Sequence, residues 1–136
     1  MVGEKSVSVS LMATLNGIGI VTADMAATVR FYRLIGLDVA DPSPDHLDTF
    51  LSNGVRFMFD TEAVIGSFHE GWKRSTGNQL SLAFECDSPA DVDDVYRRVV
   101  EAGFRGRKEP WDAFWGQRYA QLEDPDGVPV DLYAAL

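Results

Sequence analysis

The chain has 136 residues and a mass of 15.0 kDa, which is enough for one domain or for two small, closely packed halves. Its composition, 46% hydrophobic and 24% charged, is typical of a soluble globular protein and excludes an intrinsically disordered one. The 21 acidic residues outnumber the 12 basic ones, so the net charge is −9. This charge argues against nucleic acid and anionic membranes as partners, because phosphate contacts need a basic surface, and it is compatible with a cationic small molecule.

The cysteine content and the apolar pattern predict a cytoplasmic protein. Cys86 has no second cysteine to pair with, so a reducing compartment is expected, and nothing basic beside it would activate the thiol. No apolar stretch approaches the roughly 20 residues that span a bilayer. Residues 1–13 mix small and apolar side chains, and we expect a tail there rather than an added edge strand.

The first half of the chain carries the signals of a strand, a helix and a hairpin. Asp24 is a typical N-cap after a β-branched run, and Gly36 stands where a helix C-cap is expected. Asn53-Gly54 is a strong hairpin signal between two apolar segments. The expected order is a strand at Gly17–Val21, a helix from Asp24 to Gly36, the segment Leu37–Ala40 before a turn at 41–44, and strands at His46–Leu51 and Val55–Asp60.

The second half repeats this order. Ser88-Pro89-Ala90-Asp91 is a capping box with proline at the first helical position, and Gly103 closes the helix that it starts. The expected strands are Leu80–Cys86 before the helix and, after it, Arg105–Glu109, Gln117–Glu123 and Val128–Tyr133.

These landmarks define an internal repeat. When Asp24 is matched with Ser88, the two helices align without a gap, and Gly54 matches Gly127. We therefore predict an α+β protein, residues 1–136 forming a single domain, with a βαβββ module at 15–61, a connector at 62–78 and a second βαβββ module at 79–136.

Alternation along the last strand of each module predicts which side chains face the helices. One face is uniformly apolar, and the other is either solvated or lines a cavity. The apolar set is Val55, Phe57, Phe59, Val128, Val130 and Leu132, and the opposite set is Arg56, Met58, Asp60, Pro129, Asp131 and Tyr133.

Several of these motifs together resemble a known protein family. The strand that ends in Asp24, the helix with Phe31-Tyr32-Arg33 and Gly36-Leu37, and Trp115-Gly116-Gln117-Arg118 before Asp124-Pro125-Asp126-Gly127 resemble the vicinal oxygen chelate superfamily over residues 15–135. That superfamily includes glyoxalase I, extradiol dioxygenases, fosfomycin-resistance transferases and bleomycin-resistance proteins. The resemblance implies curved half-barrel sheets with helices on the outer face, and a homodimer with clefts between paired modules. The Trp-Gly-x-Arg segment looks most like the bleomycin-resistance branch, whose members bind drugs without chemistry.

The resemblance also implies four metal-ligand positions, which here read Gly17, Met58, Ser81 and Asp131. Only Asp131 is a good ligand for a divalent cation, so no metal or other cofactor and no catalytic residue is expected. The alternative is a metal-dependent enzyme of the glyoxalase or dioxygenase type that uses atypical ligands such as His46, Asp60 and Asp131. Without such a role, His46 and also His69 are expected to be surface residues beside turns.

Aromatic side chains gather in one short segment of the second module. Trp111, Phe114, Trp115 and Tyr119 lie within nine residues and form either a stacking wall for a planar ligand or a hydrophobic lid packed on the core.

Charged residues near this segment have a functional and a structural interpretation. Asp60 and Asp131 are expected to receive positive groups of a ligand, and Asp131 is alternatively bonded to a neighbour such as Arg118. Arg118 either contacts the ligand or pairs with Asp131 or Glu123. Met58 and Tyr133 complete the expected ligand-binding set.

The sequence thus predicts a non-catalytic protein that resembles the bleomycin-resistance proteins of antibiotic resistance. It would sequester a bulky aromatic, cationic compound in a cleft at a homodimer interface. A family member with a regulatory or scaffolding role is a further possibility, and the ligand itself is not identified.

Overall fold

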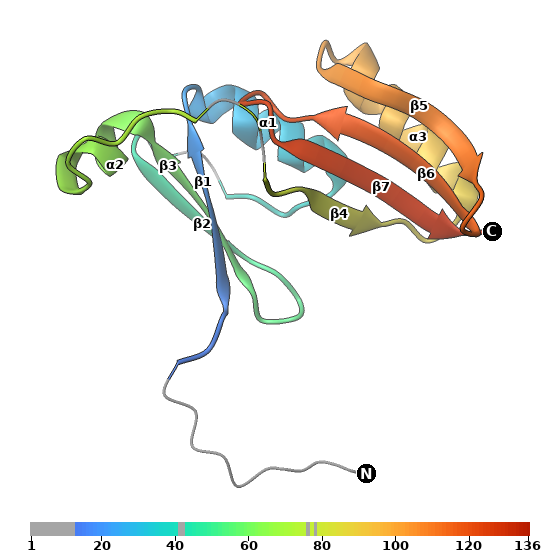
Figure 1. Cartoon of the computed structure of the whole chain (residues 1–136), viewed down its shortest axis with the longest axis horizontal. Helices are drawn as coiled ribbons and strands as arrows, with labels where there is room; N and C mark the ends of the chain where they lie inside the picture. The colour runs from blue at the N-terminus through green and yellow to red at the C-terminus, as the bar shows by residue number, and fades with distance from the viewer. Residues whose placement is uncertain (1–12, 41–42, 76, 78) are drawn as a thin grey trace, which may run out of the picture.

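The computed structural model describes residues 13–40, 43–75, 77 and 79–136, and within them it contains seven strands and three helices (Figure 1). The expected tail at 1–13 therefore lies almost wholly outside the described residues. The elements are, in chain order, β1 (Gly17–Thr22), α1 (Met25–Ile35), β2 (His46–Phe50), β3 (Arg56–Thr61), α2 (Glu62–Phe68), β4 (Leu82–Glu85), α3 (Pro89–Glu101), β5 (Arg105–Ala113), β6 (Gln117–Glu123) and β7 (Pro129–Ala135).

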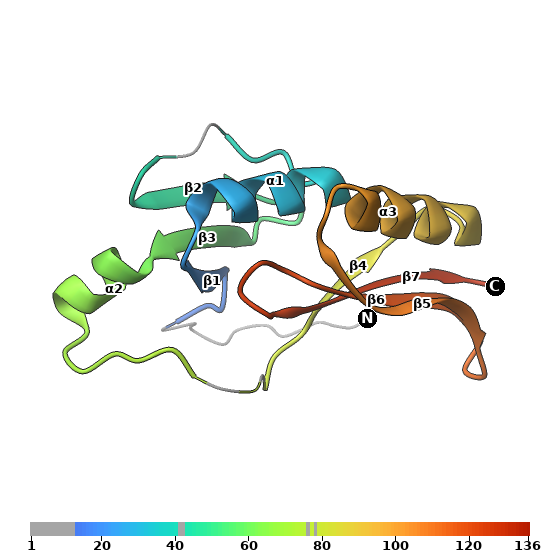
Figure 2. The same ribbon diagram turned by 90° about the horizontal axis from the view of Figure 1, so that it is seen from above.

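The strands form two sheets that share one helical layer. The first sheet has the order β1-β3-β2 and the second the order β4-β7-β6-β5. In each sheet the first strand of the module pairs in parallel with the last one, and the hairpins are antiparallel. Helix α3 packs on β5, β6 and β7, and α1 lies next to α3 (Figure 2). No helix in the described part of the chain is long and apolar enough to cross a membrane.

The predicted α+β class is confirmed, but the first module is one strand shorter than expected. Residues 37–40 lie in no strand. The guanidinium of Arg33 donates to the carbonyl of Val39 at 3.0 and 2.8 Å, and the Thr49 hydroxyl donates to the carbonyl of Asp38 at 2.9 Å. Side chains thus bind the carbonyls that a neighbouring strand would otherwise use.

Helix α2 lies in the segment that was predicted to be a plain connector. Thr61 is its N-cap and accepts from the amide of Val64 at 3.3 Å. None of its seven residues is buried, so the sequence has no apolar periodicity that would reveal a helix.

The caps of the two long helices confirm the predictions. The carboxylate of Asp24 accepts from the amide of Ala27 at 3.1 Å, and Ser88 accepts from the amide of Asp91 at 3.3 Å. Gly36 has a φ of 122°, a conformation that favours glycine.

One continuous core joins both modules, and the predicted sidedness is confirmed for the four apolar residues within β3 and β7, whereas Val55 and Val128 precede these strands and are only half-buried. Phe57, Phe59, Val130 and Leu132 are all buried under the helices. Tyr32 of α1 lies at the centre of this core. Its ring is 5.3 Å from the rings of Phe57 and Phe59 in the first sheet and 6.4 Å from that of Phe84 in the second.

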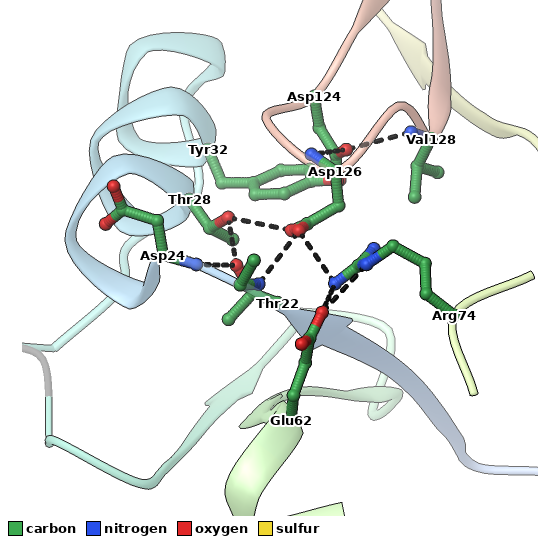
Figure 3. Close-up of polar contacts among 10 residues, drawn as sticks. Thr22, Asp24, Thr28, Tyr32, Glu62, Arg74, Asp124, Asp126 and Val128 are labelled. Carbon is green, nitrogen blue, oxygen red and sulfur yellow. Dashed lines mark hydrogen bonds and ion pairs between the residues drawn. The ribbon is translucent and has the colours of Figure 1, made fainter. Parts of the chain in front are cut away.

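A polar joint fixes the turn before β7 against the first module (Figure 3). The carboxylate of Asp124 accepts from the Tyr32 hydroxyl at 2.8 Å. Asp126 accepts from the amide of Ala23 at 2.9 Å and the hydroxyl of Thr28 at 3.3 Å, and it pairs with Arg74 at 3.2 Å. Since β7 follows directly, this turn sets where the central strand of the second sheet begins.

Candidate functional site

The second sheet has one open face, and several predicted site residues project from it. One side of β6 and β7 is buried against α3, and the residues on it are Ala120, Leu122, Val130 and Leu132. Their neighbours along each strand therefore project from the opposite side of the sheet. Tyr119 opposes Tyr133 in the register, and Gln121 opposes Asp131. This open face of the sheet is turned toward the viewer in Figure 1, with α3 behind it.

Four rings on this side of the second sheet form what we call the aromatic face: Trp111, Trp115, Tyr119 and Tyr133. The centroid of the Trp111 ring is 6.0 Å from that of Trp115 and 5.5 Å from that of Tyr119, both edge to face. Trp115 and Tyr119 are 5.3 Å apart, and Tyr119 stacks on Tyr133 at 6.3 Å. Phe114 extends from Trp115 at 5.1 Å and is 97% exposed. The rings lie outside the buried core cluster, which does not fit the alternative of a lid packed on the core.

A nearly buried carboxylate lies beside these rings. Asp131 is 8% exposed and accepts a hydrogen bond of 2.5 Å from the Tyr119 hydroxyl and a longer one of 3.4 Å from the Gln121 amide. Burial, together with this bond to the negative carboxylate, raises the pKa of Tyr119 to about 12, so the phenol stays a donor at neutral pH. Among the described residues, no cation pairs with Asp131. Gln121 was missed by the sequence analysis, although it lies two residues after Tyr119 in a correctly predicted strand.

Arg118 lies on the other side of the sheet. Its guanidinium donates to both carboxylate oxygens of Asp93 on α3, at 2.9 and 3.1 Å, and to Asp112 at 3.1 Å. Asp93 and Asp112 raise its pKa further above the usual value. The expected pairing of Arg118 with Asp131 or Glu123 is therefore wrong. Alternation explains the error, because Arg118 and Tyr119 are adjacent in β6 and must project to opposite faces.

Met58 and Asp60 lie on β3 of the first sheet, not beside the aromatic face. Asp60 is already engaged, because Nδ1 of His46 lies 2.5 Å from its carboxylate. Nε2 of His46 lies 2.9 Å from Asp48. The hydrogen bond with Asp60 is the largest cause of a raised pKa of His46, and the Asp48 carboxylate adds to it. His46 thus lies between two carboxylates at the surface of the first sheet.

The positions implied for a metal do not fit one. Gly17 offers no side chain, and the space over it is taken by Met58, whose Cε lies 3.1 Å from where a Cβ would stand. The fourth position, Asp131, already binds Tyr119. The atypical set does not gather either, because His46 and Asp60 lie on the first sheet and Asp131 on the second. Within the described residues, no group of three or more His, Cys, Asp or Glu side chains is placed to hold a metal ion.

Two hollows lie away from the aromatic face. One of about 840 Å³ separates the first sheet from β4 and is lined by Ile18, Leu37, Phe50 and Phe84 among others. Another of about 470 Å³ lies beside Cys86 and α3. Neither hollow is evident from the sequence, because each is made by segments far apart in the chain.

The fold agrees with the comparison to known proteins. The family model described as Glyoxalase/Bleomycin resistance protein/Dioxygenase superfamily matches residues 14–132, and the chain belongs to this superfamily. No curated protein matches the chain significantly.

Solved structures from several bacteria share the fold. A glyoxalase/bleomycin resistance protein/dioxygenase from Nocardioides is 23% identical, with 95% of this chain and 87% of that one covered and a TM-score of 0.72. A family enzyme of the same description from Burkholderia phytofirmans PsJN is 22% identical, with 91% and 100% covered and a TM-score of 0.75. A lactoylglutathione lyase from Agrobacterium tumefaciens is 16% identical, with 91% and 94% covered and a TM-score of 0.64. At these identities the similarity establishes the fold, and the activity must be argued from the site.

Proposed function

We propose that the protein binds a planar aromatic cation on the aromatic face and sequesters it without chemistry. The observation that carries the proposal is a nearly buried carboxylate, Asp131, that accepts a hydrogen bond from Tyr119 of the aromatic face and has no cation paired to it in the described residues. A buried charge is costly unless it is paired, so a ligand that brings a positive group to this place would gain from it.

The chemistry of the rings supports the same class of ligand. Indole and phenol faces attract cations through the ring quadrupole and stack on planar rings, and few torsions are frozen when they do so. Tyr119 donates a hydrogen bond to Asp131. This bond makes the phenol ring richer in electrons and therefore a better partner for a cation. The net charge of −9 would speed the approach of such a ligand and weaken its binding as salt rises.

We further propose that the protein is a homodimer, as the family resemblance suggests, in which a second copy of the chain pairs at the free strand edges of the sheets. In the described residues β1 pairs only with β3, and β4 pairs only with β7, so each sheet ends in a free strand edge. Large apolar side chains also lie exposed on both sheets: Phe50, at the end of β2, is 73% exposed, and Leu80, just before β4, is 77% exposed. Sedimentation at several concentrations tests this part, and a monomer at all of them would contradict it.

Equilibrium dialysis with two dyes of similar shape tests the binding proposal. 9-Aminoacridine is a planar cation, and acridine is neutral in mildly alkaline buffer. We expect the wild type to retain 9-aminoacridine more strongly than acridine, because only the former brings a charge to Asp131. Equal retention of both dyes would refute the charge argument, and retention of neither would refute the proposal.

Matched variants locate the site. Trp111→Ala removes a ring of the aromatic face, and Trp72→Ala removes an indole from the segment after α2. Asp131→Asn removes the carboxylate charge, and Asp94→Asn makes the same change on α3, where Asp94 has a surface pair with Arg97. We expect Trp111→Ala and Asp131→Asn each to weaken 9-aminoacridine binding about tenfold, which corresponds to a loss of about 1.4 kcal/mol of binding free energy. The control variants should bind like the wild type.

A further inference from the structure

The aromatic face already holds a cation of the protein itself. Nζ of Lys108 lies 4.2 Å from the centroid of the Trp111 ring, within the range of a cation–π interaction. Lys108 opposes Gln121 in the register, and Gln121 opposes Asp131, so the three residues lie in one row across the sheet. The side chain of a lysine thus occupies part of the surface that the proposed ligand needs.

A local irregularity of β5 brings Lys108 to this face. Residues three apart in a regular strand project to opposite faces, yet Lys108 and Trp111 oppose Gln121 and Tyr119, which share a face. The register shifts between Lys108 and Trp111, which absorbs the extra residue and turns both side chains to the same side. The contact is therefore built into the backbone and is not an accident of a long side chain.

Nothing else in the described residues ties the Lys108 ammonium down. Its neighbours on β5 lie near a carboxylate: Arg105 is 3.9 Å and Arg107 3.6 Å from Glu123. No ion pair of Lys108 is formed among the described residues, and its contact is with the Trp111 ring. Lys108 can therefore withdraw from the ring into water at the cost of one exposed cation–π interaction.

We propose that Lys108 is a specificity residue, a tethered competitor that occupies the cation position over Trp111 until a ligand displaces it. This inference rests on the proposed function and refines its ligand class. A lysine ammonium is compact and strongly hydrated, and its tether keeps it at millimolar effective concentration beside the ring. A primary ammonium in solution gains little by replacing it. A delocalised, weakly hydrated cation with a planar surface gains the stacking area as well, so the face selects planar ring cations over simple amines.

The test compares Lys108→Met with Lys73→Met in the full chain. Both variants lose one lysine charge, and Lys73 is an exposed residue of the segment after α2. We expect Lys108→Met to bind 9-aminoacridine about two- to fivefold more tightly than Lys73→Met does. This range of affinity corresponds to the energy of the exposed cation–π interaction that the ligand no longer has to displace. The affinity for neutral acridine should rise less.

A second readout follows Lys108 directly. In the wild type the Trp111 ring should shift the NMR signals of the Lys108 ε-methylene upfield, and saturating 9-aminoacridine should return them to the values of an exposed lysine. Equal affinities of the two variants, weaker binding by Lys108→Met, or a signal that stays upfield in the complex would overturn the inference while leaving the proposed function intact. No binding by the wild type or either variant would overturn both.

Discussion

Replacing Tyr119 by phenylalanine tests whether the carboxylate of the aromatic face is held in place by the fold. The change removes the donor that lies 2.5 Å from Asp131 and leaves this carboxylate the longer bond of 3.4 Å from Gln121. A hydrogen bond to a charged group contributes about 1.5–3 kcal/mol, and at 8% exposure water can replace it only in part. We therefore expect the free energy of unfolding to fall by about 2 kcal/mol.

Urea denaturation at neutral pH measures this loss, and Tyr133→Phe is the matched control. Tyr133 stacks on the same ring at 6.3 Å, and no hydrogen bond of its hydroxyl is formed among the described residues, so the control should change stability by no more than about 0.5 kcal/mol. Since the pKa of Tyr119 is about 12 in the folded protein, above the ordinary tyrosine value, the contribution persists at neutral pH and is lost only as the pH rises toward 12. Equal losses in the two variants would refute this reasoning.

Two other variants test the packing of the modules and the charges of the first sheet. Tyr32→Phe removes the buried donor to Asp124 and should cost about 1–3 kcal/mol of unfolding free energy, whereas Tyr96→Phe should cost little; similar costs would contradict a specific role of the polar joint. The pKa of His46 is raised by its two flanking carboxylates, so the histidine should stabilise the fold below about pH 6.5 and lose this effect as the pH rises through the folded pKa. The difference in stability between wild type and His46→Gln should shrink accordingly, by no more than about 1 kcal/mol for so exposed a group, and a difference that does not depend on pH would contradict this role of His46.

Local signals carried the prediction of the fold. The two N-caps, the hairpin glycines and the alternating apolar residues act over a few positions, and each specifies its element almost alone. The elements that escaped prediction lack such signals. Helix α2 buries nothing, and the segment 37–40 is kept out of a sheet by side chains from elsewhere in the first module.

The candidate site was predictable where alternation is regular and not where it is broken. Tyr119, Asp131 and Tyr133 follow from the period of two in β6 and β7, and the same period should have placed Arg118 on the opposite face. The strand predicted at Arg105–Glu109 continues in the structure to Ala113, and its register with β6 shifts twice. For the same reason no periodic pattern could bring Lys108 to the ring of Trp111.

The placement of the ligand is the central claim, and the three tryptophans of the chain report on it directly. Each indole N–H gives one signal in a nitrogen–proton correlation spectrum, and alanine variants assign the signals. When 9-aminoacridine is added, we predict that the signals of Trp111 and Trp115 shift in a saturable way and that the signal of Trp72 stays in place. A spectrum in which all three signals stay in place, or in which only Trp72 responds, would contradict binding at the aromatic face.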